Sequence, residues 1–427
     1  MKEAFLHFIW QERLFETSAL TTVDGEGLEV VHPGIPNRDE GPDFVGAQVR
    51  VGGVLWAGDV EIHLRSSDWY VHGHYGDPRY DAVVLHVVAE HDEVVRRGNG
   101  EVIPEVVLRW DPVLTEAYER LMRSRAWVAC GDDLHRLDPF VVRHSLGRLL
   151  AERLEYHASH FLPDLEETAR DWEEVLYRHL ARGFGLRVNA RPFYEVARSL
   201  PLRYLARHRD NLLHVEALLF GQAGFLEEEL FGDDHYEALK KEYRHLRNKF
   251  SLEPLPAHRW RRMRMRPSAF PAVRLAQFAR FIHSRENIFS HIIRSPDMSA
   301  LEPLFRITAD GYWEEHFEFN KPSRRRKKSF GKEAFFLVLI NIVIPFYFIY
   351  GKINGLDDYR ERALELLEAL PAERNAIVRG WAAAGVGADS AFYSQALIHL
   401  KNEYCNRQRC LECPLGRRIM RAKGEQR

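Results

Sequence analysis

The hydrophobic residues of the first 110 positions fall into short runs that are typical of β-strands. Residues 43–51, 54–64 and 82–90 are rich in β-branched side chains, and Gly52-Gly53 separates the first two runs as a turn would. Residues 28–32 and 105–110 are shorter strand candidates, and residues 1–16 have the pattern of a helix. This pattern predicts an α/β domain, which we place at residues 1–130.

From about residue 138 the hydrophobic positions recur with the 3.6-residue period of helices. The predicted helices cover residues 140–160, 171–183, 212–219, 234–250, 272–283, 330–350, 358–370 and 390–403. The apolar run 335–350 contains Asn341 and Pro345 and is shorter than the roughly 20 residues that cross a bilayer. We therefore expect a buried helix there, inside an all-α domain at 131–400. A Cys-containing segment with a basic tail follows at 401–427, and the fold class is α+β.

Charge is divided unevenly along the chain, although 60 basic and 62 acidic residues leave a net charge of only −2. The first 120 residues carry a net charge of −12, and the remainder carries +10. A metal site would account for concentrated carboxylates and a polyanionic partner for excess cations, whereas uneven solvation is the alternative. Four cysteines make no disulfide framework, and no leader peptide is recognisable at the N-terminus. We expect a cytoplasmic protein without a membrane partner.

The second predicted strand carries three ionisable residues in one row. Asp59, Glu61 and His63 alternate with apolar positions and therefore share one face of the strand. Asp43 opens the preceding strand, and the turn at residues 52–53 brings it close to the end of the second strand. Converging carboxylates with a nitrogen base can hold Mg²⁺ or Mn²⁺ and polarise a phosphate or a water.

These residues resemble the signature of the PD-(D/E)XK nuclease superfamily. Pro42-Asp43 matches its first half and Glu61-Ile62-His63 its second, with His where the family has Lys. The resemblance implies a restriction-endonuclease-like fold of αβββαβ order for the N-terminal domain. It also implies that Asp43 and Glu61 bind the metal, with Asp59 auxiliary, and that His63 positions or deprotonates the attacking water.

A second polar cluster follows the strand, with His72, His74 and Asp77 close together in the sequence. Imidazoles suit transition metals, so this cluster is a candidate metal site. It is alternatively a loop that wraps the first site, or a polar loop whose histidines only make local hydrogen bonds.

The cysteines give a separate signal. Cys405, Cys410 and Cys413 lie within nine positions, and Cys130 lies far upstream. Four thiolates can hold a [4Fe–4S] cluster or a structural Zn²⁺, whereas unligated thiols are the alternative. One upstream and three downstream cysteines resemble the arrangement in iron–sulfur nucleases of the RecB type, although the downstream spacing differs from theirs.

Two basic clusters are candidates for contact with nucleic acid, for which DNA is the expected kind. The first surrounds Trp260, whose ring is able to stack on an unpaired base, and the second is a dense run after residue 320. A segment paired with acidic neighbours and a solvated loop are the respective alternatives. The candidate contact residues are Arg259, Arg261, Arg262, Arg324, Arg325, Arg326, Lys327 and Lys328.

Four phrases, GPDFVGAQVRVGG, GDVEIHLRSSDWYVHGH, EALLFGQAGFL and YCNRQRCLECPLG, together resemble a family of uncharacterised bacterial proteins over essentially the full chain. That resemblance implies one unit but no activity. The residues favour a metal-dependent nuclease. The alternatives are a non-catalytic nucleic-acid-binding or scaffold protein with a degenerate nuclease fold, and a metal-dependent hydrolase of a small substrate.

Overall fold

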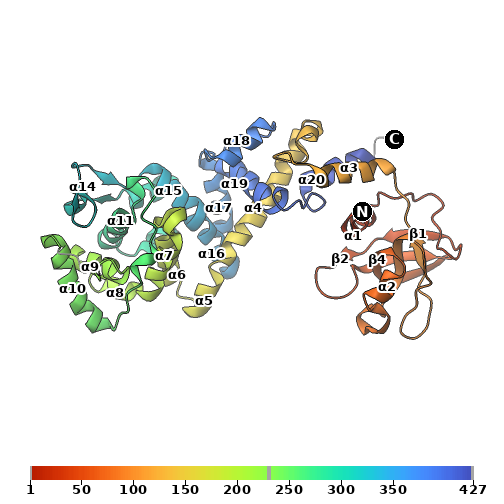
Figure 1. Ribbon diagram of the computed structural model, residues 1–427, viewed down its shortest axis with the longest axis horizontal. Helices are drawn as coiled ribbons and strands as arrows, with labels where there is room; N and C mark the ends of the chain where they lie inside the picture. Colours follow the sequence, from red (N-terminus) through yellow and green to blue (C-terminus); the bar gives the residue numbers. More distant parts are fainter. Residues whose placement is uncertain (1, 228–231, 425–427) are drawn as a thin grey trace. The chain divides into compact units, whose positions relative to one another are not determined.

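A mixed β-sheet with helices around it forms the N-terminal part of the chain in this computed structural model, which describes residues 2–227 and 232–424 (Figure 1). The strand order is β1-β3-β4-β5-β6, with β2 paired to β3. Neighbours from β1 to β4 are antiparallel, whereas β4, β5 and β6 run parallel. The strands are β1 (Leu28–His32), β2 (Ile35–Pro36), β3 (Phe44–Val51), β4 (Val54–Arg65), β5 (Val83–Glu90) and β6 (Glu105–Val107).

The local sequence explains the two central strands. Gly52 and Gly53 both have positive φ and form the turn between β3 and β4. The first six residues of β5 are all buried, as expected for a parallel strand covered on both faces. Helix α1 (Glu3–Gln11) contacts β4, and its buried Phe5 stacks on Tyr118 of α3 (Pro112–Arg123).

The chain folds into two compact units, each built from segments that are distant in the sequence. Unit 1 comprises the described residues within 1–146, 375–387 and 397–427, and unit 2 comprises those within 147–374 and 388–396. Unit 1 therefore contains both the sheet and the cysteine-rich segment. The predicted domain ranges 1–130, 131–400 and 401–427 stay predictions, and residues 425–427 lie outside the described residues.

The rest of the chain is mostly helical, as predicted. The remaining helices of unit 1 include α2 (Asp68–Val71), α18 (Ala376–Ala383) and α20 (Pro414–Gly424), with the short turns η1 (His74–Gly76), η2 (Pro78–Tyr80), η3 (Gly131–Arg136) and η8 (Leu400–Cys405). Helices α4 (Pro139–Ser159) and α19 (Ala391–His399) have residues in both units.

Unit 2 contains small two-stranded sheets besides its helices, which the periodicity did not predict. Its α-helices are α5 (Leu162–Glu167), α6 (Trp172–Phe184), α7 (Leu186–Ser199), α8 (Leu202–Ala206), α9 (Leu212–Gln222), α10 (Asp234–Phe250), α11 (Pro271–Ser284), α12 (Ile288–Arg294), α13 (Met298–Leu301), α14 (Tyr312–Glu315), α15 (Lys332–Val338), α16 (Ile344–Asn354) and α17 (Asp357–Ala369). The remaining short elements are η4 (Ala257–Arg259), η5 (Pro267–Ala269), η6 (Glu302–Phe305), β7 (Thr308–Ala309), β8 (His316–Glu318), β9 (Lys321–Pro322) and β10 (Lys328–Ser329).

The longest apolar helix is interrupted by a π-helical turn. Helices α15 and α16 continue through η7 (Leu339–Val343), which is π-helical. Pro345 has no N–H and its ring conflicts with the carbonyl four residues earlier, so the regular hydrogen-bond pattern cannot pass residue 341. The whole segment Lys332–Asn354 is long and apolar enough to cross a bilayer, but 78% of its most apolar window is buried, which is typical of a core helix.

Candidate metal centre

Polar residues form a row across three adjacent strands on one face of the sheet. Glu61 and His63 lie on β4, and Glu61 is in register with His86 on β5, which in turn is in register with Glu105 on β6. All four side chains are buried. Their apolar neighbours on β4, including Val60 and Ile62, occupy the opposite face and are fully buried as well. The alternation predicted for this part of β4 is therefore confirmed.

A hydrogen-bonded chain links the row and fixes the protonation of His63. Glu105 Oε2 lies 2.7 Å from His86 Nδ1, and His86 Nε2 lies 2.8 Å from His63 Nδ1. Burial by itself would raise the pKa of Glu105, but hydrogen bonds from His86 and Ser66 outweigh it and hold that pKa below its usual range. A carboxylate only accepts, so His86 donates from Nδ1, and in its neutral tautomer its Nε2 accepts from His63 Nδ1–H. The Nε2 atom of His63 is left with a lone pair.

The pKa of His63 supports this assignment. Burial, followed by the charges of His86, His72 and His74, lowers the pKa of His63 to about 2. The ring is therefore neutral, which is the form that binds metals. A carboxylate that orients a ligating imidazole through hydrogen bonds is the usual second layer of a metal site, and here a second histidine extends that layer.

A short loop places two more imidazoles against the row. His72 follows α2 and His74 begins η1, and Gly73 between them has φ +80°, which allows the sharp turn that brings both rings close to His63, although His72 stays exposed. His74 stacks on Tyr80 with ring centroids 3.9 Å apart. Tyr80 and the buried Trp69 belong to an apolar cluster beneath the loop, so the loop is anchored by packing.

The ligand atoms of this loop and of β4 converge. One nitrogen from each of His63, His72 and His74 lies within 4.8 Å of the other two. His63 Nε2 is 3.1 Å from His72 Nδ1, and Glu61 Oε1 is 3.1 Å from His74 Nε2 and 3.6 Å from His63 Nε2. Ligands at 2.0–2.1 Å from one ion lie about 2.8–3.0 Å apart in an octahedral arrangement and about 3.3–3.4 Å apart in a tetrahedral one. The two spacings of 3.1 Å lie between these values, whereas the 3.6 Å between Glu61 Oε1 and His63 Nε2 is longer.

One buried atom of this group lacks a hydrogen bond, whereas His63 Nε2 and His72 Nδ1 are within hydrogen-bond distance of each other. His74 Nε2 is buried without hydrogen-bond geometry to any partner, although Glu61 Oε1 lies 3.1 Å away. An orphaned imidazole nitrogen in such a place is costly unless a cation occupies the space between the two groups. The donor set of three imidazoles and one carboxylate fits Mn²⁺, Fe²⁺ or Zn²⁺, whereas Mg²⁺ prefers oxygen ligands.

Asp43 lies beside this centre, at the start of β3. Its backbone N–H donates to Glu61 Oε2 (3.0 Å), and its Oδ2 accepts from the Ile62 N–H (3.0 Å). Burial raises the pKa of Glu61, and the charge of Asp43 adds to the increase while His74 opposes it. The two carboxyl groups of the predicted signature are therefore neighbours, as the turn between β3 and β4 requires.

Helix α1 contributes two residues that sequence reasoning missed. His7 Nε2 lies 3.3 Å from Asp43 Oδ2. Burial opposes protonation of His7, but Asp43 outweighs it and raises the pKa of His7 above its usual range. Glu3 is one helical turn earlier, and burial raises its pKa, with Asp43 and Glu61 adding to the rise. The i, i+4 spacing of Glu3 and His7 next to the apolar face of the helix was the available signal.

Two residues of the predicted site lie elsewhere. Asp59 Oδ1 accepts from the Gly46 N–H (3.0 Å) at a register shift between β3 and β4, so its carboxylate supports a bulge. Asp77 caps η2 and binds Arg79, and hydrogen bonds from Arg79 lower its pKa to about 2. The structure thus brings together Asp43, Glu61, His63, His72 and His74 but not Asp59 or Asp77.

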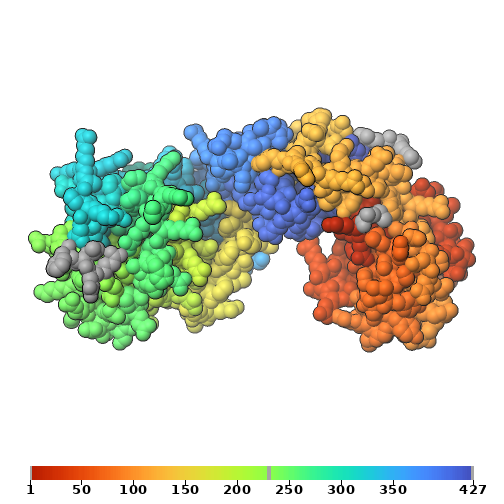
Figure 2. Space-filling view, in the orientation of Figure 1, coloured from red at the N-terminus to blue at the C-terminus, as the bar shows by residue number. Residues whose placement is uncertain are grey.

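The four cysteines belong to one neighbourhood in unit 1. Helix α20, blue in Figure 1, lies beside α3 and contacts η3, which Cys130 precedes. In Figure 2 the dark-blue surface of the C-terminal segment lies against orange surface of the same unit. Burial raises the pKa of the Cys130 thiol, and the charges of Cys413, Cys405 and Cys410 add to the increase. The Gly416 N–H donates to Cys413 Sγ at 3.4 Å, and a Cβ on Gly416 would collide with the Cys410 carbonyl. All four thiols are free of disulfides.

The first basic cluster is a rigid loop of unit 2. Trp260 is buried and its Nε1–H donates to the Ala223 carbonyl, so its ring is not available to stack on a base. Asn189 clamps the backbone of Arg261 through two hydrogen bonds, and Arg262 lies over the Phe225 ring. The side chains of Arg259 and Arg261 are exposed.

The second basic cluster is only partly available. Lys328 is buried, and its ammonium donates to the carbonyls of Trp313 and Glu314, which gives it a structural role in place of the predicted phosphate contact. Arg325 pairs with the Glu314 carboxylate at 2.7 Å. The side chains of Arg324, Arg326 and Lys327 are exposed.

Comparison with known proteins gives one match. The model of a family described as "Protein of unknown function (DUF2851)" matches residues 3–376. No curated protein and no solved structure matches the chain.

Proposed function

We propose that this chain, which belongs to the DUF2851 family of proteins of unknown function, is a metal-dependent hydrolase of phosphodiester bonds. The observation that carries the proposal is the convergence of His63, His72, His74 and Glu61 on one point beside Asp43. In this reading the centre uses a divalent transition metal. Of the two ions predicted from the sequence, Mn²⁺ is favoured over Mg²⁺ because three of the four donors are nitrogens.

The topology of unit 1 supports a relationship to the PD-(D/E)XK nucleases. A helix, three antiparallel strands, a short helical connection and a strand parallel to the third follow one another as α1, β1, β3, β4, α2 and β5. This corresponds to the αβββαβ order expected from the resemblance. Asp43 and Glu61 occupy the start of one central strand and the middle of the next, which are the positions that the signature requires.

In the proposed mechanism the chain supplies the metal ligands and a proton acceptor. His63, His72, His74 and Glu61 hold the ion, which when bound acts as a Lewis acid on a phosphoryl oxygen and lowers the pKa of water. Asp43 is the residue best placed to accept a proton, since it lies beside the centre and is one-quarter exposed. His7, whose pKa is raised by its pairing with Asp43, adds positive charge next to an anionic substrate.

Nucleic acid is the substrate class that the remaining features support. Exposed guanidinium and ammonium groups of unit 2, on Arg259, Arg261, Arg324, Arg326 and Lys327, suit a polyphosphate backbone. They carry no sequence specificity, since phosphate contacts position a nucleic acid without identifying bases. A hydrolase of small substrates is the second candidate, because an imidazole-rich centre next to an exposed loop needs no extended partner.

The test uses the full chain stripped of metal and reloaded with Mn²⁺, Zn²⁺ or Mg²⁺. The substrates are bis(p-nitrophenyl) phosphate, single-stranded DNA and double-stranded DNA. We expect turnover with Mn²⁺ or Zn²⁺ that His63→Ala and Asp43→Asn reduce by about 10²-fold or more. Glu101→Gln is the matched control, because that carboxylate is exposed and pairs with Arg97.

Each outcome separates the candidates. Cleavage of DNA supports the nuclease, and cleavage of the small diester alone supports the second candidate. Salt-dependent DNA binding without turnover in any metal refutes both and leaves the non-catalytic binding protein. Unchanged activity in Asp43→Asn, with a melting temperature equal to that of the unmodified chain, refutes the role given to Asp43.

A metal centre at the cysteines is part of the same proposal. Burial raises the pKa of the Cys130 and Cys405 thiols, and the charges of the other cysteines add to the increase, so these thiols become thiolates together only if a cation compensates them. We assign this role to a [4Fe–4S] cluster or a Zn²⁺ ion. The centre would be structural, because it ties the segment before α20 to the segment before η3.

A further inference from the structure

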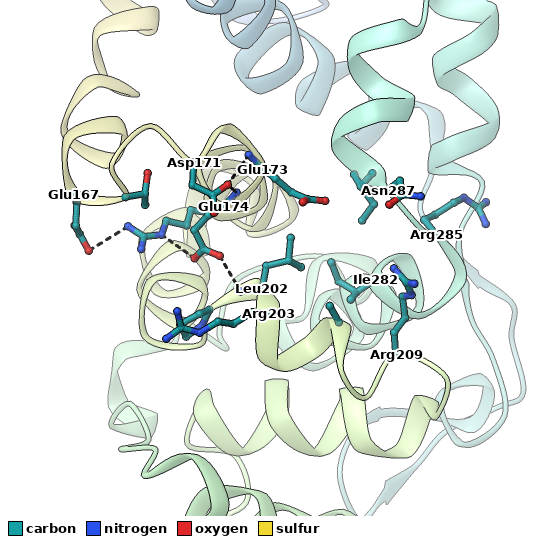
Figure 3. A pocket seen from close by; sticks show the side chains of 15 residues that line it. Glu167, Asp171, Glu173, Glu174, Leu202, Arg203, Arg209, Ile282, Arg285 and Asn287 are labelled. Carbon is teal, nitrogen blue, oxygen red and sulfur yellow. Dashed lines mark hydrogen bonds and ion pairs between the residues drawn. The ribbon is translucent and has the colours of Figure 1, made fainter.

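Two of the cavities in the helical unit differ in chemistry. The larger of these two has a volume of about 680 Å³, and carboxylates and guanidiniums face each other across it (Figure 3). Glu167 and Glu174 are neutralised by Arg178 at 3.2 and 3.1 Å, and Arg209 pairs with Glu286. Since its charges are balanced, this cavity selects neither an anion nor a cation.

The smaller cavity has a volume of about 330 Å³ and no carboxylate in its lining. Helices α4, α6 and α7 and the π-helical turn η7 surround it, and Phe161 and Ile342 contribute to an apolar wall. Its polar lining consists of His157, His160, His179, Arg182, Arg187 and Asn341. The volume lies at the lower end of the roughly 300–1,000 Å³ range of small-molecule sites.

The two arginines of this cavity differ in exposure, since Arg182 is half-buried and Arg187 is exposed. Among the described residues, no carboxylate lies within ion-pair distance of Arg182 or Arg187. Burial lowers the pKa of His160, and the positive charge of Arg182 lowers it further. Two uncompensated guanidiniums in a concave, partly apolar site attract an anion, and their forked donors match the oxygens of a phosphate or carboxylate.

The third histidine is held in one orientation by a buried network. Asp164 accepts hydrogen bonds from His179 Nε2 (2.9 Å), Arg178 Nη1 (2.8 Å) and Tyr194 Oη (2.8 Å). Because the ionised carboxylate only accepts, His179 donates from Nε2 and keeps a lone pair on Nδ1. The ring also stacks on Phe161 with centroids 3.9 Å apart. This network provides a preorganised wall for the cavity rather than a mobile surface.

The π-helical turn η7, which Pro345 accounts for, also contributes to the cavity wall. Asn341 is in η7 and lines the cavity, and its side-chain amide donates to the Leu337 carbonyl at 2.9 Å. π-helical turns are rare and occur frequently at functional sites. Here the turn places Asn341 and Ile342 on the cavity wall, together with the imidazoles and guanidiniums contributed by α4, α6 and α7.

We propose that this cavity binds a small organic anion through Arg182 and Arg187, with its apolar part against Phe161 and Ile342. The ligand class is a phosphate monoester or carboxylate with a compact aromatic or aliphatic body. The site lies entirely in unit 2 and shares no residue with the candidate metal centre. It therefore does not depend on the hydrolase activity proposed above.

The test is calorimetric titration of the full chain in the presence of a chelator, so that the metal centre does not contribute. The probes are phenyl phosphate and benzoate, with benzyl alcohol as the uncharged control. We expect saturable binding of at least one anion and none of the alcohol. Arg182→Gln and Arg187→Gln should each weaken binding by about tenfold or more, since each removes a charge-assisted contact.

Arg191→Gln is the matched control, because Arg191 is on α7 but pairs with Glu195 and does not line the cavity. The relative affinities of phenyl phosphate and benzoate distinguish the two oxyanions. Absence of saturable binding by either anion up to about 10 mM overturns the proposal. So does equal affinity in Arg182→Gln, Arg187→Gln and the unmodified chain, provided that circular dichroism shows all three folded.

Discussion

Replacing Glu105 by Gln tests whether the buried chain of hydrogen bonds prepares His63 for a metal. Glu105 does not touch the convergent atoms, and two hydrogen bonds through His86 separate it from His63 Nε2. Gln has the same shape and still offers one oxygen to His86. It removes the negative charge that fixes the direction of donation along the chain and raises the basicity of His63.

The magnitude follows from the place of Glu105 in the site. Loss of a partner in the second layer of a metal site typically costs 10–100-fold in affinity. That range corresponds to about 1.4–2.7 kcal/mol. The free energy of unfolding should change less. The amide oxygen of Gln can still accept from His86. Its NH₂ group would take the place of Oε1, which lies 2.7 Å from the Ser66 hydroxyl, and that hydroxyl can accept a hydrogen bond.

The measurement is the dissociation constant of Mn²⁺ and Zn²⁺, obtained by competition with a chromogenic chelator at neutral pH. Urea denaturation of the metal-free chain measures folding separately, and Glu101→Gln serves as the control for loss of one carboxylate. Equal metal affinity in Glu105→Gln and the unmodified chain would refute the reasoning. A loss of affinity that only accompanies partial unfolding of the metal-free chain would contradict it too.

Three further changes probe other parts of the molecule. Cys410→Ser should remove iron or zinc from the cysteine centre, measured by elemental analysis, and lower the melting temperature, while retention of full metal content would contradict four-thiolate ligation. Asp164→Asn should lower the free energy of unfolding in urea by about 1–3 kcal/mol, because it removes the charged acceptor of His179, Arg178 and Tyr194, while Arg178 keeps its pairs with Glu167 and Glu174. Burial would raise the pKa of Asp164, but bonds from His179, Arg178 and Tyr194 lower it to about 2. Its stabilisation is therefore complete above the ordinary value of 3.8 and is lost as pH falls toward 2, a loss that Asp164→Asn should not show. Arg261→Gln should reduce the slope of log Kd for DNA against log salt by about one, and an unchanged slope would remove Arg261 from the interface.

Strands and helices with complete local signals could be predicted from the sequence. The helix predicted at 234–250 coincides with α10, whose Asp233 caps the first turn. Helix α7 was missed because Pro192 lies inside it. The backbone is non-helical at Asn189, so a new helical start follows and Pro192 occupies its first turn. Asn189 is held there by Arg261, 72 positions away, which no local pattern reveals.

Some residues of the candidate metal centre could likewise be predicted from local sequence patterns, and others could not. The residues on β4 and in the loop after it were identified because alternation and spacing are local properties. Their supporting residues, His86 and Glu105, lie on strands whose pairing is parallel and therefore set by connections rather than by a turn. From the sequence, His86 could be interpreted only as a buried histidine with satisfied hydrogen bonds. It is buried and hydrogen-bonded, and its contacts with His63 and Glu105 suit a residue that positions His63.

The histidine at position 63 explains why the site departs from the nuclease signature that it resembles. A lysine there would present an ammonium, which has three donors and no lone pair and so cannot bind a cation while protonated. His63 has the opposite properties, because burial and the neighbouring imidazoles keep it neutral and His86 directs its remaining lone pair outward. The change from Lys to His therefore belongs with His72, His74 and Glu105, since a neutral ligand needs further ligands and a carboxylate behind it. In the proposed function, His63, His72 and His74 are the nitrogen ligands, Glu105 supports His63 through His86, and Asp43 is the proton acceptor.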